Sequence, residues 1–167
     1  ALVFLLCVSL VPIPATASTA ESSSLPQLTP AQPGKLLVCE DLLSFNYPDT
    51  KIDKAEWVAA EDGEPAHCLV RGRMHERDGV GPFGVETYAI GFEMRLPEEW
   101  SGRFLYQANG GLDGNVVEAY GYIGSGPSAL SRGFAVISSD AGHSGNQFLF
   151  GLDPQARLDY GYQAVGK

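Results

Sequence analysis

The residues best suited to chemistry in this chain form a glycine-rich turn, Asn109-Gly110-Gly111, directly after a short apolar run. Two consecutive glycines let the backbone take unusual dihedral angles and come close to a bound molecule. A backbone N–H that points into a cleft from such a turn stabilises the negative charge that develops on an attacked carbonyl oxygen. The turn is therefore a candidate oxyanion hole, and an ordinary tight turn is the alternative.

A second polar group follows the next apolar run and contains Asp140, His143 and Ser144. Residues 142–146 read Gly-His-Ser-Gly-Asn, which nearly matches the Gly-x-Ser-x-Gly motif of a nucleophile elbow. The fifth residue is Asn, however, and no helix is expected directly after the motif, whereas an elbow needs a strand, a sharp turn and a helix together. Ser144 is therefore not expected to be a nucleophile. We expect these three side chains and Asn109 to line the edge of a cleft.

The other ionisable side chains do not complete a catalytic set. His67 and His75 lie around an earlier hairpin and are expected at the protein surface. Asp113, Asp140 and Asp153 are candidate acids of a triad, but the sequence pairs none of them with a histidine. A serine–histidine–acid arrangement needs all three groups within hydrogen-bond reach. The segment therefore offers an anion-stabilising turn without a nucleophile.

Two pairs of strands are expected to position these residues, and the first pair is antiparallel. Residues 86–96 alternate between two faces, one of which carries Tyr88, Ile90, Phe92, Met94 and Leu96. The opposite face carries Thr87, Ala89, Gly91, Glu93 and Arg95. Residues 68–75 form the partner strand, and the glycine-rich stretch 78–84 joins the two strands as a hairpin.

The chain after Gly102 follows a different pattern. Residues 103–108 and 134–138 are short apolar runs, as expected for parallel strands that are buried on both faces. A helix is predicted between them over residues 127–132, because Pro suits its first position and Gly133 suits its end. A strand, a helix and a strand in this order predict a right-handed parallel crossover.

These elements predict an α/β fold, more specifically the N-terminal portion of an α/β-hydrolase-like sheet, in which an antiparallel hairpin precedes a parallel β-α-β-α run. A final helix, with Asp153 as its N-cap and Pro154 in its first turn, completes the run. The carboxyl ends of the parallel strands place the turn at 109–111 where open α/β sheets bind ligands. The next strand in that order carries the nucleophile elbow. We expect it to be missing here, which leaves the sheet incomplete with an exposed edge.

Composition sets the broad class of the protein. The 167 residues are 44% hydrophobic and 19% charged, which is typical of a globular domain or of part of a larger one. The formal net charge of −9 argues against nucleic acid and anionic membranes as partners, because both bind basic surfaces.

The N-terminal region has the pattern of an export signal. Residues 1–20 contain no ionisable side chain, and the apolar run at 2–11 is too short to span a bilayer. Small residues follow and fit a cleavage site, so we interpret 1–20 as a secretory signal peptide without its initiator Met; a buried core segment is the alternative. Residues 21–35 are rich in Ser and Pro and are predicted to be a linker, and residues 36–167 form the folded domain. The expected location is secreted or periplasmic, with no membrane association after cleavage.

Export favours a disulfide between the two cysteines of the folded part, Cys39 and Cys68. A bridge that closes a loop of this length stabilises a domain by roughly 3–4 kcal/mol. Two metal-binding thiolates are the alternative. No second Cys or His cluster stands at ligand spacing, however, so no metal is expected in this segment.

Several short motifs, taken in order, resemble the tannase and feruloyl esterase family. They are Trp100–Leu105 with the following Asn109-Gly110-Gly111, then Leu130–Val136, Asp140–Ser144 and Asp159–Val165. The resemblance covers residues 36–167, and the order and spacing of the motifs are more specific than any one of them. Cys39 and Cys68 are also similar to the first disulfide of that family.

The resemblance implies a secreted serine esterase with an α/β-hydrolase core and a large lid domain, acting on small aromatic esters of the feruloyl or galloyl type. It implies that the backbone of Gly110 and Gly111 contributes to the oxyanion hole, with Gly111 as the preferred donor. Leu112 replaces a more usual aromatic or small residue, which leaves the preference for the acyl group open.

The rest of the family's active site belongs beyond Lys167. This part includes the Ser-Asp-His triad, a disulfide next to the catalytic Ser and His, and a calcium site in the lid. The resemblance therefore implies no triad residue and no cofactor in this segment, and the fragment alone is expected to be inactive.

A different class of function fits the same residues. The chain is also interpretable as a self-contained secreted β-rich module that binds a carbohydrate or an aromatic ligand at the glycine turn, without catalysis. A nucleophile elbow encoded after Lys167 distinguishes the esterase from the binding module.

Overall fold

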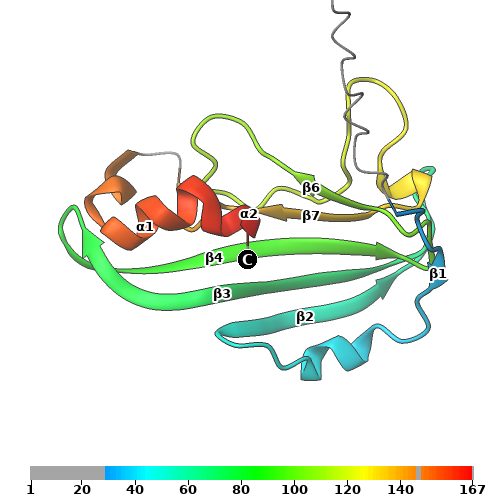
Figure 1. The fold of residues 1–167 in the computed structure, drawn as a ribbon, viewed down its shortest axis with the longest axis horizontal. Coiled ribbons are helices and arrows are strands. Elements are labelled where there is room, and N and C mark those ends of the chain that lie inside the picture. Colours follow the sequence, from blue (N-terminus) through cyan, green and yellow to red (C-terminus); the bar gives the residue numbers. More distant parts are fainter. Residues whose placement is uncertain (1–28, 146–147, 167) are drawn as a thin grey trace, which may run out of the picture. The chain divides into compact units, whose positions relative to one another are not determined.

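The computed structural model describes residues 29–145 and 148–166, and the fold below is that of the compact unit that begins at Ala31. Residues 1–20, interpreted as a signal peptide, and residues 21–28 lie outside the described part. The unit is built on a mixed five-stranded sheet with the order β2-β3-β4-β7-β6 (Figure 1). These strands are β2 (Thr50–Val58), β3 (His67–Gly81), β4 (Gly84–Pro97), β6 (Phe104–Gln107) and β7 (Ala135–Ser139).

The antiparallel hairpin is confirmed and is longer than expected. β3 and β4 stay paired as far as Gly81 and Gly84, so that only Pro82 and Phe83 form the turn. The stretch 78–84, which its glycines marked as a loop, is therefore mostly strand. β7 pairs with β4 over only a few residues, so the hairpin tip extends well beyond the end of β7.

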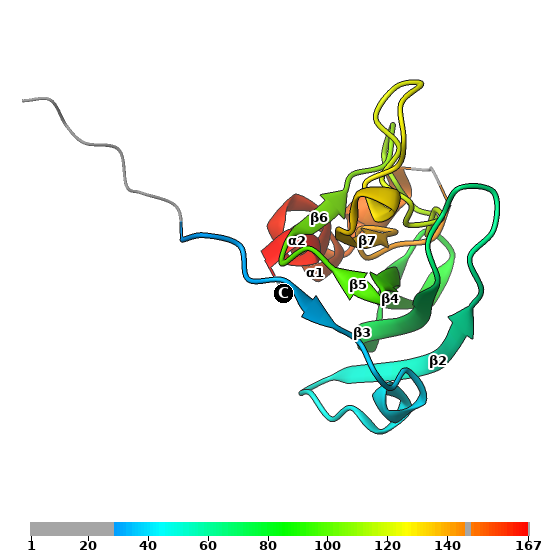
Figure 2. The same ribbon diagram turned by 90° about the vertical axis from the view of Figure 1, so that its right-hand side faces the viewer.

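The parallel pair is confirmed as well. β6 runs parallel to β7 from Phe104 opposite Ala135 to Gln107 opposite Ser138. β7 in turn pairs antiparallel with β4, which joins the pair and the hairpin into one sheet, as the view along the strands in Figure 2 shows. The chain is therefore α/β with a mixed sheet.

The α-helix predicted between β6 and β7 is wrong. The connection contains only a 3-10 turn, η2 (Leu130–Arg132). Gly133 ends this turn in the left-handed conformation (φ 78°), as expected, and the Ser128 hydroxyl accepts the N–H of Ser131 at 2.8 Å. The segment between Pro127 and Gly133 is too short to offset the cost of nucleating an α-helix, and Gly133 ends it after a single turn.

The C-terminal helical segment begins as predicted. Asp153 is the N-cap of α1 (Pro154–Leu158), and its carboxylate accepts the N–H of Ala156 at 2.7 Å. A 3-10 turn precedes α1, and a π-helical turn and a last short turn follow it; they are η3 (Phe148–Leu152), η4 (Asp159–Gln163) and α2 (Ala164–Gly166).

Arg77 on β3 ties this helical segment to the sheet. Its guanidinium donates to the carboxylates of Asp153 and Asp159 at 2.9 and 3.3 Å, and Asp153 also accepts the N–H of Val80 at 3.0 Å. These contacts hold α1 beside the hairpin end of β3 and β4 (Figure 1). Among the helices of the described residues, none has the length and apolar character that a membrane crossing requires.

The disulfide between Cys39 and Cys68 is confirmed, and both residues are fully buried. It joins the segment before β2, which contains the 3-10 turn η1 (Glu40–Ser44), to the start of β3. Both cysteines belong to one core cluster with Val70 and Phe92. The bridge therefore fastens the N-terminal part of the fold to the centre of the sheet.

The folded part begins slightly before Leu36, inside the stretch expected to be linker. β1 (Gly34–Lys35) pairs antiparallel with β5 (Glu99–Trp100). The Lys35 ammonium group lies 2.9 and 2.8 Å from the carboxylates of Glu98 and Glu99. A composition rich in Ser and Pro did not reveal this pairing, because the partner residues stand far away in the sequence.

The second face of β4, which the alternating pattern marks as polar, is buried at its C-terminal end. Glu93 and Arg95 on this face are only 1% and 3% exposed. The Glu93 carboxylate accepts hydrogen bonds from Arg71 (2.6 Å), Arg95 (2.8 Å) and the N–H of Ala119 (3.0 Å), which lies in the β6–β7 connection. Burial alone would raise the pKa of Glu93, but these donors and the charge of Arg95 lower it overall.

His67 belongs to the same buried network, so the expectation that it lies at the surface is wrong. Its ring is 1% exposed; Nδ1 donates to the carbonyl of Pro65 at 2.8 Å, and Nε2 lies 2.9 Å from Nη1 of Arg95. An arginine only donates, so Nε2 must accept and the imidazole is neutral. Burial, with the nearby charge of Arg95, lowers the pKa of His67 accordingly.

Candidate functional site

Three segments meet at one end of the sheet. They are the turn 108–114 after β6, the loop 140–145 after β7, and the hairpin tip 81–84. Because β6 and β7 are parallel, their carboxyl ends lie side by side. The antiparallel pairing of β4 with β7 brings the hairpin tip to the same end. The site residues expected from the sequence therefore stand on adjoining loops.

Asn109 holds the glycine turn against the end of β7. Its side-chain amide donates to the Ser139 carbonyl (2.8 Å), the Ser138 hydroxyl (3.2 Å) and the Asn115 carbonyl (3.3 Å). The Asn109 amide is thus occupied by contacts within the protein and is not available to bind a ligand. It determines where the following glycines lie.

Gly110 and Gly111 form the exposed part of the turn. Gly111 has a φ of 68°, in the left-handed region that glycine adopts without strain. A Cβ on either glycine would meet no atom within 4 Å. Within the part of the chain that the structure describes, neither N–H group donates a hydrogen bond to the backbone. The turn therefore has the free donors and the open space that an oxyanion hole requires.

Gly114 brings the glycine turn into direct backbone contact with the loop after β7. Its N–H donates to the Asp140 carbonyl at 3.0 Å, and its carbonyl accepts the N–H of Gly145 at 2.7 Å. With a φ of 83°, any side chain at this position would be strained and would collide with the backbone of Gly145. Only glycine permits the two loops to approach this closely.

Asp140 is partly buried and organises its own loop. Its Oδ1 accepts the N–H of Gly142 at 2.9 Å and the N–H of Gly91 on β4 at 3.0 Å. Burial raises the pKa of Asp140 to about 6. The hydrogen bonds from the N–H groups of Gly142 and Gly91 lower this pKa, whereas the nearby charge of Asp113 raises it further. The carboxyl group is therefore ionised at neutral pH at a cost to the folded state.

Replacing Asp140 with Asn is expected to raise the free energy of unfolding at neutral pH by roughly 2–3 kcal/mol, because each pKa unit corresponds to about 1.4 kcal/mol. The folded carboxyl holds its proton up to a pH of about 6, whereas the unfolded one loses it near 3.8. The folded state thus binds more protons between these values, and wild-type stability falls as the pH rises through this window.

Urea unfolding of both proteins between about pH 4 and pH 8 measures this difference. The Asn variant keeps Oδ1 as an acceptor and does not ionise, so the two curves should converge near pH 4 and separate by pH 7. A stability difference that does not change with pH would contradict the assignment of Asp140.

His143 is 2% exposed and lies among aromatic side chains. Its ring stacks on Phe150 with centroids 3.8 Å apart and meets Tyr160 edge-on at 5.7 Å. Burial lowers the pKa of His143, so the imidazole is neutral at neutral pH. Phe150 and Tyr160 come from the C-terminal helical segment, so this stack joins that segment to the loop after β7.

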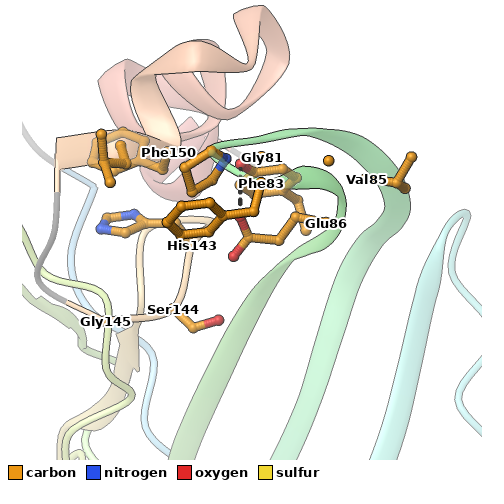
Figure 3. Close-up of a pocket in the computed structure, with 12 residues that line it drawn as sticks. Gly81, Phe83, Val85, Glu86, His143, Ser144, Gly145 and Phe150 are labelled. Carbon is orange, nitrogen blue, oxygen red and sulfur yellow. Dashed lines mark hydrogen bonds between the residues drawn. The ribbon is translucent and has the colours of Figure 1, made fainter.

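A cavity of about 400 Å³ lies between this loop and the hairpin tip. His143 and Ser144 line it on one side, and Phe83 and Glu86 line it on the other (Figure 3). The imidazole nitrogens of His143 point away from Glu86 in this view. Ser144 is exposed.

The four side chains expected to line a cleft therefore have different surroundings. Asn109 and Asp140 are occupied by backbone groups, His143 is stacked and buried, and Ser144 alone is exposed. Sequence reasoning missed the contact between the turn that carries Asp113 and the loop of His143; glycines in both segments were the only signal. Across residues 29–145 and 148–166, no group of three or more His, Cys, Asp or Glu side chains is placed to hold a metal ion.

Known proteins with a similar sequence are esterases. The family model described as "Tannase and feruloyl esterase" matches residues 74–167. The chain is 41% identical over 123 residues (67% of its length) to mono(2-hydroxyethyl) terephthalate hydrolase of Piscinibacter sakaiensis. It is 43% identical over 77 residues (44% of its length) to a probable feruloyl esterase B-2 of Aspergillus flavus. It is 26% identical over 137 residues (75% of its length) to an uncharacterised esterase of Agrobacterium fabrum. The matches span 20%, 13% and 23% of these relatives' lengths, respectively.

Proposed function

We propose, from the premise that this chain belongs to the tannase and feruloyl esterase family, that it is the N-terminal portion of an α/β-hydrolase domain in a secreted or periplasmic serine esterase. The observation that carries the proposal is the exposed turn at Gly110 and Gly111, with free backbone donors at the carboxyl end of a parallel strand. Sheets of this kind bind ligands at that place. The disulfide of Cys39 and Cys68 supports export to an oxidising compartment.

In this function the chain stabilises charge and does not supply the nucleophile. A serine from another part of the protein attacks the ester carbonyl carbon, and a histidine accepts the proton of its hydroxyl. The carbonyl oxygen becomes an oxyanion, which the N–H groups of Gly110 and Gly111 hold. The alcohol then leaves with the proton, and water attacks the acyl-enzyme to release the acid. Asn109 and Gly114 keep the turn in position during both steps.

The proposed substrates are small esters of aromatic acids. Two of the relatives, a probable feruloyl esterase and a mono(2-hydroxyethyl) terephthalate hydrolase, are named for esters of this class. The acidic net charge of −9 argues against polyanionic substrates.

Ester hydrolysis by the full-length protein tests the proposal. Methyl ferulate, methyl gallate and mono(2-hydroxyethyl) terephthalate are offered in parallel with ethyl butyrate, and the released acid is measured. We expect turnover of at least one aromatic ester, faster than that of the aliphatic ester, and no turnover by residues 1–167 alone. Turnover by this chain alone, or no hydrolysis of any aromatic ester by the full-length protein, would contradict the proposal. Binding of methyl ferulate without hydrolysis would instead support a ligand-binding module.

A further inference from the structure

Two side chains with buried polar atoms, half-buried Asp113 and buried His143, lie on the two loops that Gly114 joins. Asp113 precedes Gly114 in the glycine turn, and His143 lies between Asp140 and Gly145, the two residues to which Gly114 is hydrogen-bonded. Oδ1 of Asp113 and both ring nitrogens of His143 are buried, and none has a hydrogen-bond partner among the described residues. The unpartnered atoms thus belong to segments in direct backbone contact.

Leaving these atoms without partners would be costly. A buried donor or acceptor without a hydrogen bond loses the hydration it had in water and gains nothing in return, and native structures satisfy nearly all such groups. The carbonyls of Leu112 and Ala141 lie near enough to the ring to favour its protonated form, but neither meets the geometry of a hydrogen bond. A neutral imidazole has one N–H donor and one acceptor nitrogen, and a carboxylate only accepts. The two side chains are therefore complementary.

We propose that Asp113 and His143 are a positioning pair in which an imidazole N–H donates to a water molecule that in turn donates to the Asp113 carboxylate. This inference rests on the proposed function, because the pair would hold the glycine turn in the orientation that presents the N–H groups of Gly110 and Gly111 to an oxyanion. Asp113 has a φ of 56°, so its backbone adopts the left-handed conformation that a side-chain anchor would help to maintain.

Aromatic packing fixes the position of the His143 ring. Phe150 and Tyr160 hold the ring from the C-terminal helical segment. Gly142 packs against Asp159 of the same segment, and the Asp159 carboxylate is paired with Arg77 on β3. The negative charge of Asp159 is thus already compensated by Arg77. The glycine turn is in this way connected, through His143, to an element anchored on the sheet.

Several ionisable groups surround His143, and Asp113 alone is assigned to it. Asp140 belongs to its own loop and is engaged with backbone N–H groups. In the view of Figure 3 the imidazole nitrogens point away from Glu86 on the hairpin. Tyr160 presents its ring to the imidazole. A change in the titration of His143 after replacement of Asp113 therefore reports on this pair.

The test uses the full-length protein labelled with 15N-histidine and the variants Asp113→Asn and His143→Gln. We expect Asp113→Asn to shift the ring 15N resonances of His143 and to lower its titration midpoint, because the variant removes a negative charge. Each variant should lower kcat on the best aromatic ester about 10- to 100-fold, the range expected for a misplaced catalytic group, with KM changed less than about twofold. The double variant should be no worse than either single variant, because both remove the same interaction.

A matched control is the pair of Asp49 and His75, whose Nδ1 lies 3.7 Å from the Asp49 carboxylate outside the candidate site. Asp49→Asn and His75→Gln should leave kcat within about twofold of wild type. Unchanged His143 resonances in Asp113→Asn, or kcat losses that multiply in the double variant, would overturn the pair. If the full-length protein hydrolyses no ester, the proposed function fails while the NMR comparison still decides the pair. If the variants do not fold, the wild-type spectrum decides, since a His143 ring N–H that exchanges freely with water would overturn the pair.

Discussion

Replacing Gly111 with Ala in the full-length protein is expected to lower kcat for ester hydrolysis about 100-fold, near the loss seen when one oxyanion donor is removed. Gly111 has a φ of 68°, and an L-residue with a side chain pays roughly 1–2 kcal/mol in this conformation. The variant can relieve this strain by rotating the peptide groups of the turn, which redirects the N–H donors. Nothing lies within 4 Å of the added methyl group, so direct collision does not contribute.

Gly124→Ala is the matched control for this prediction. Gly124 has a φ of 67°, and a Cβ there also meets nothing within 4 Å, but the residue lies outside the candidate site. Both variants should lose a similar free energy of unfolding, roughly 1–2 kcal/mol in urea titrations. Only Gly111→Ala should lose activity. Equal kcat values for the two variants would show that the turn holds no oxyanion.

Replacing Glu93 with Gln is expected to lower the free energy of unfolding by about 3–5 kcal/mol, the range for breaking a buried ion pair by removing one partner. The Glu93 carboxylate compensates Arg95, a residue that is 3% exposed and whose guanidinium lies 3.9 Å from the ring centroid of Tyr120. A neutral amide would leave that charge buried and would weaken the hydrogen bond from the N–H of Ala119. The β6–β7 connection should therefore loosen from the sheet.

Glu118→Gln is the control, because Glu118 also approaches Arg95, at 3.6 Å, but its side chain is 66% exposed. An exposed ion pair contributes about 0–1 kcal/mol, so this variant should unfold near the wild-type urea midpoint. The pKa of Glu93 is lowered below its usual 4.5, so its contribution is present above that pH and is lost as the pH falls further. Equal stability of the two variants at pH 7 would contradict the assigned role of Glu93.

Local patterns in the sequence predicted the elements that local forces determine. The alternation over residues 86–96 marked the long strand, because successive side chains in a strand point to opposite faces. Asp153 and Pro154 marked the start of the last helix, because the cap and the fixed φ act within one turn. The two short apolar runs marked the parallel pair, because strands that are buried on both faces carry apolar residues in succession. In the connection before β7, by contrast, the helix pattern of residues 127–132 was overridden by the short length of the segment, which Gly133 ends after one 3-10 turn.

The sequence by itself determined the hairpin, the parallel pair, the Cys39–Cys68 pair and the glycine turn, since each depends on neighbouring residues or on composition. Only the tertiary structure decided that Glu93 and Arg95 are buried, because alternation does not show what covers a face. It also decided that the loops of Asp113 and His143 meet. That contact joins residues far apart in the chain, through a backbone approach that needs glycine at position 114. Which groups surround the glycine turn is therefore a property of the assembled sheet.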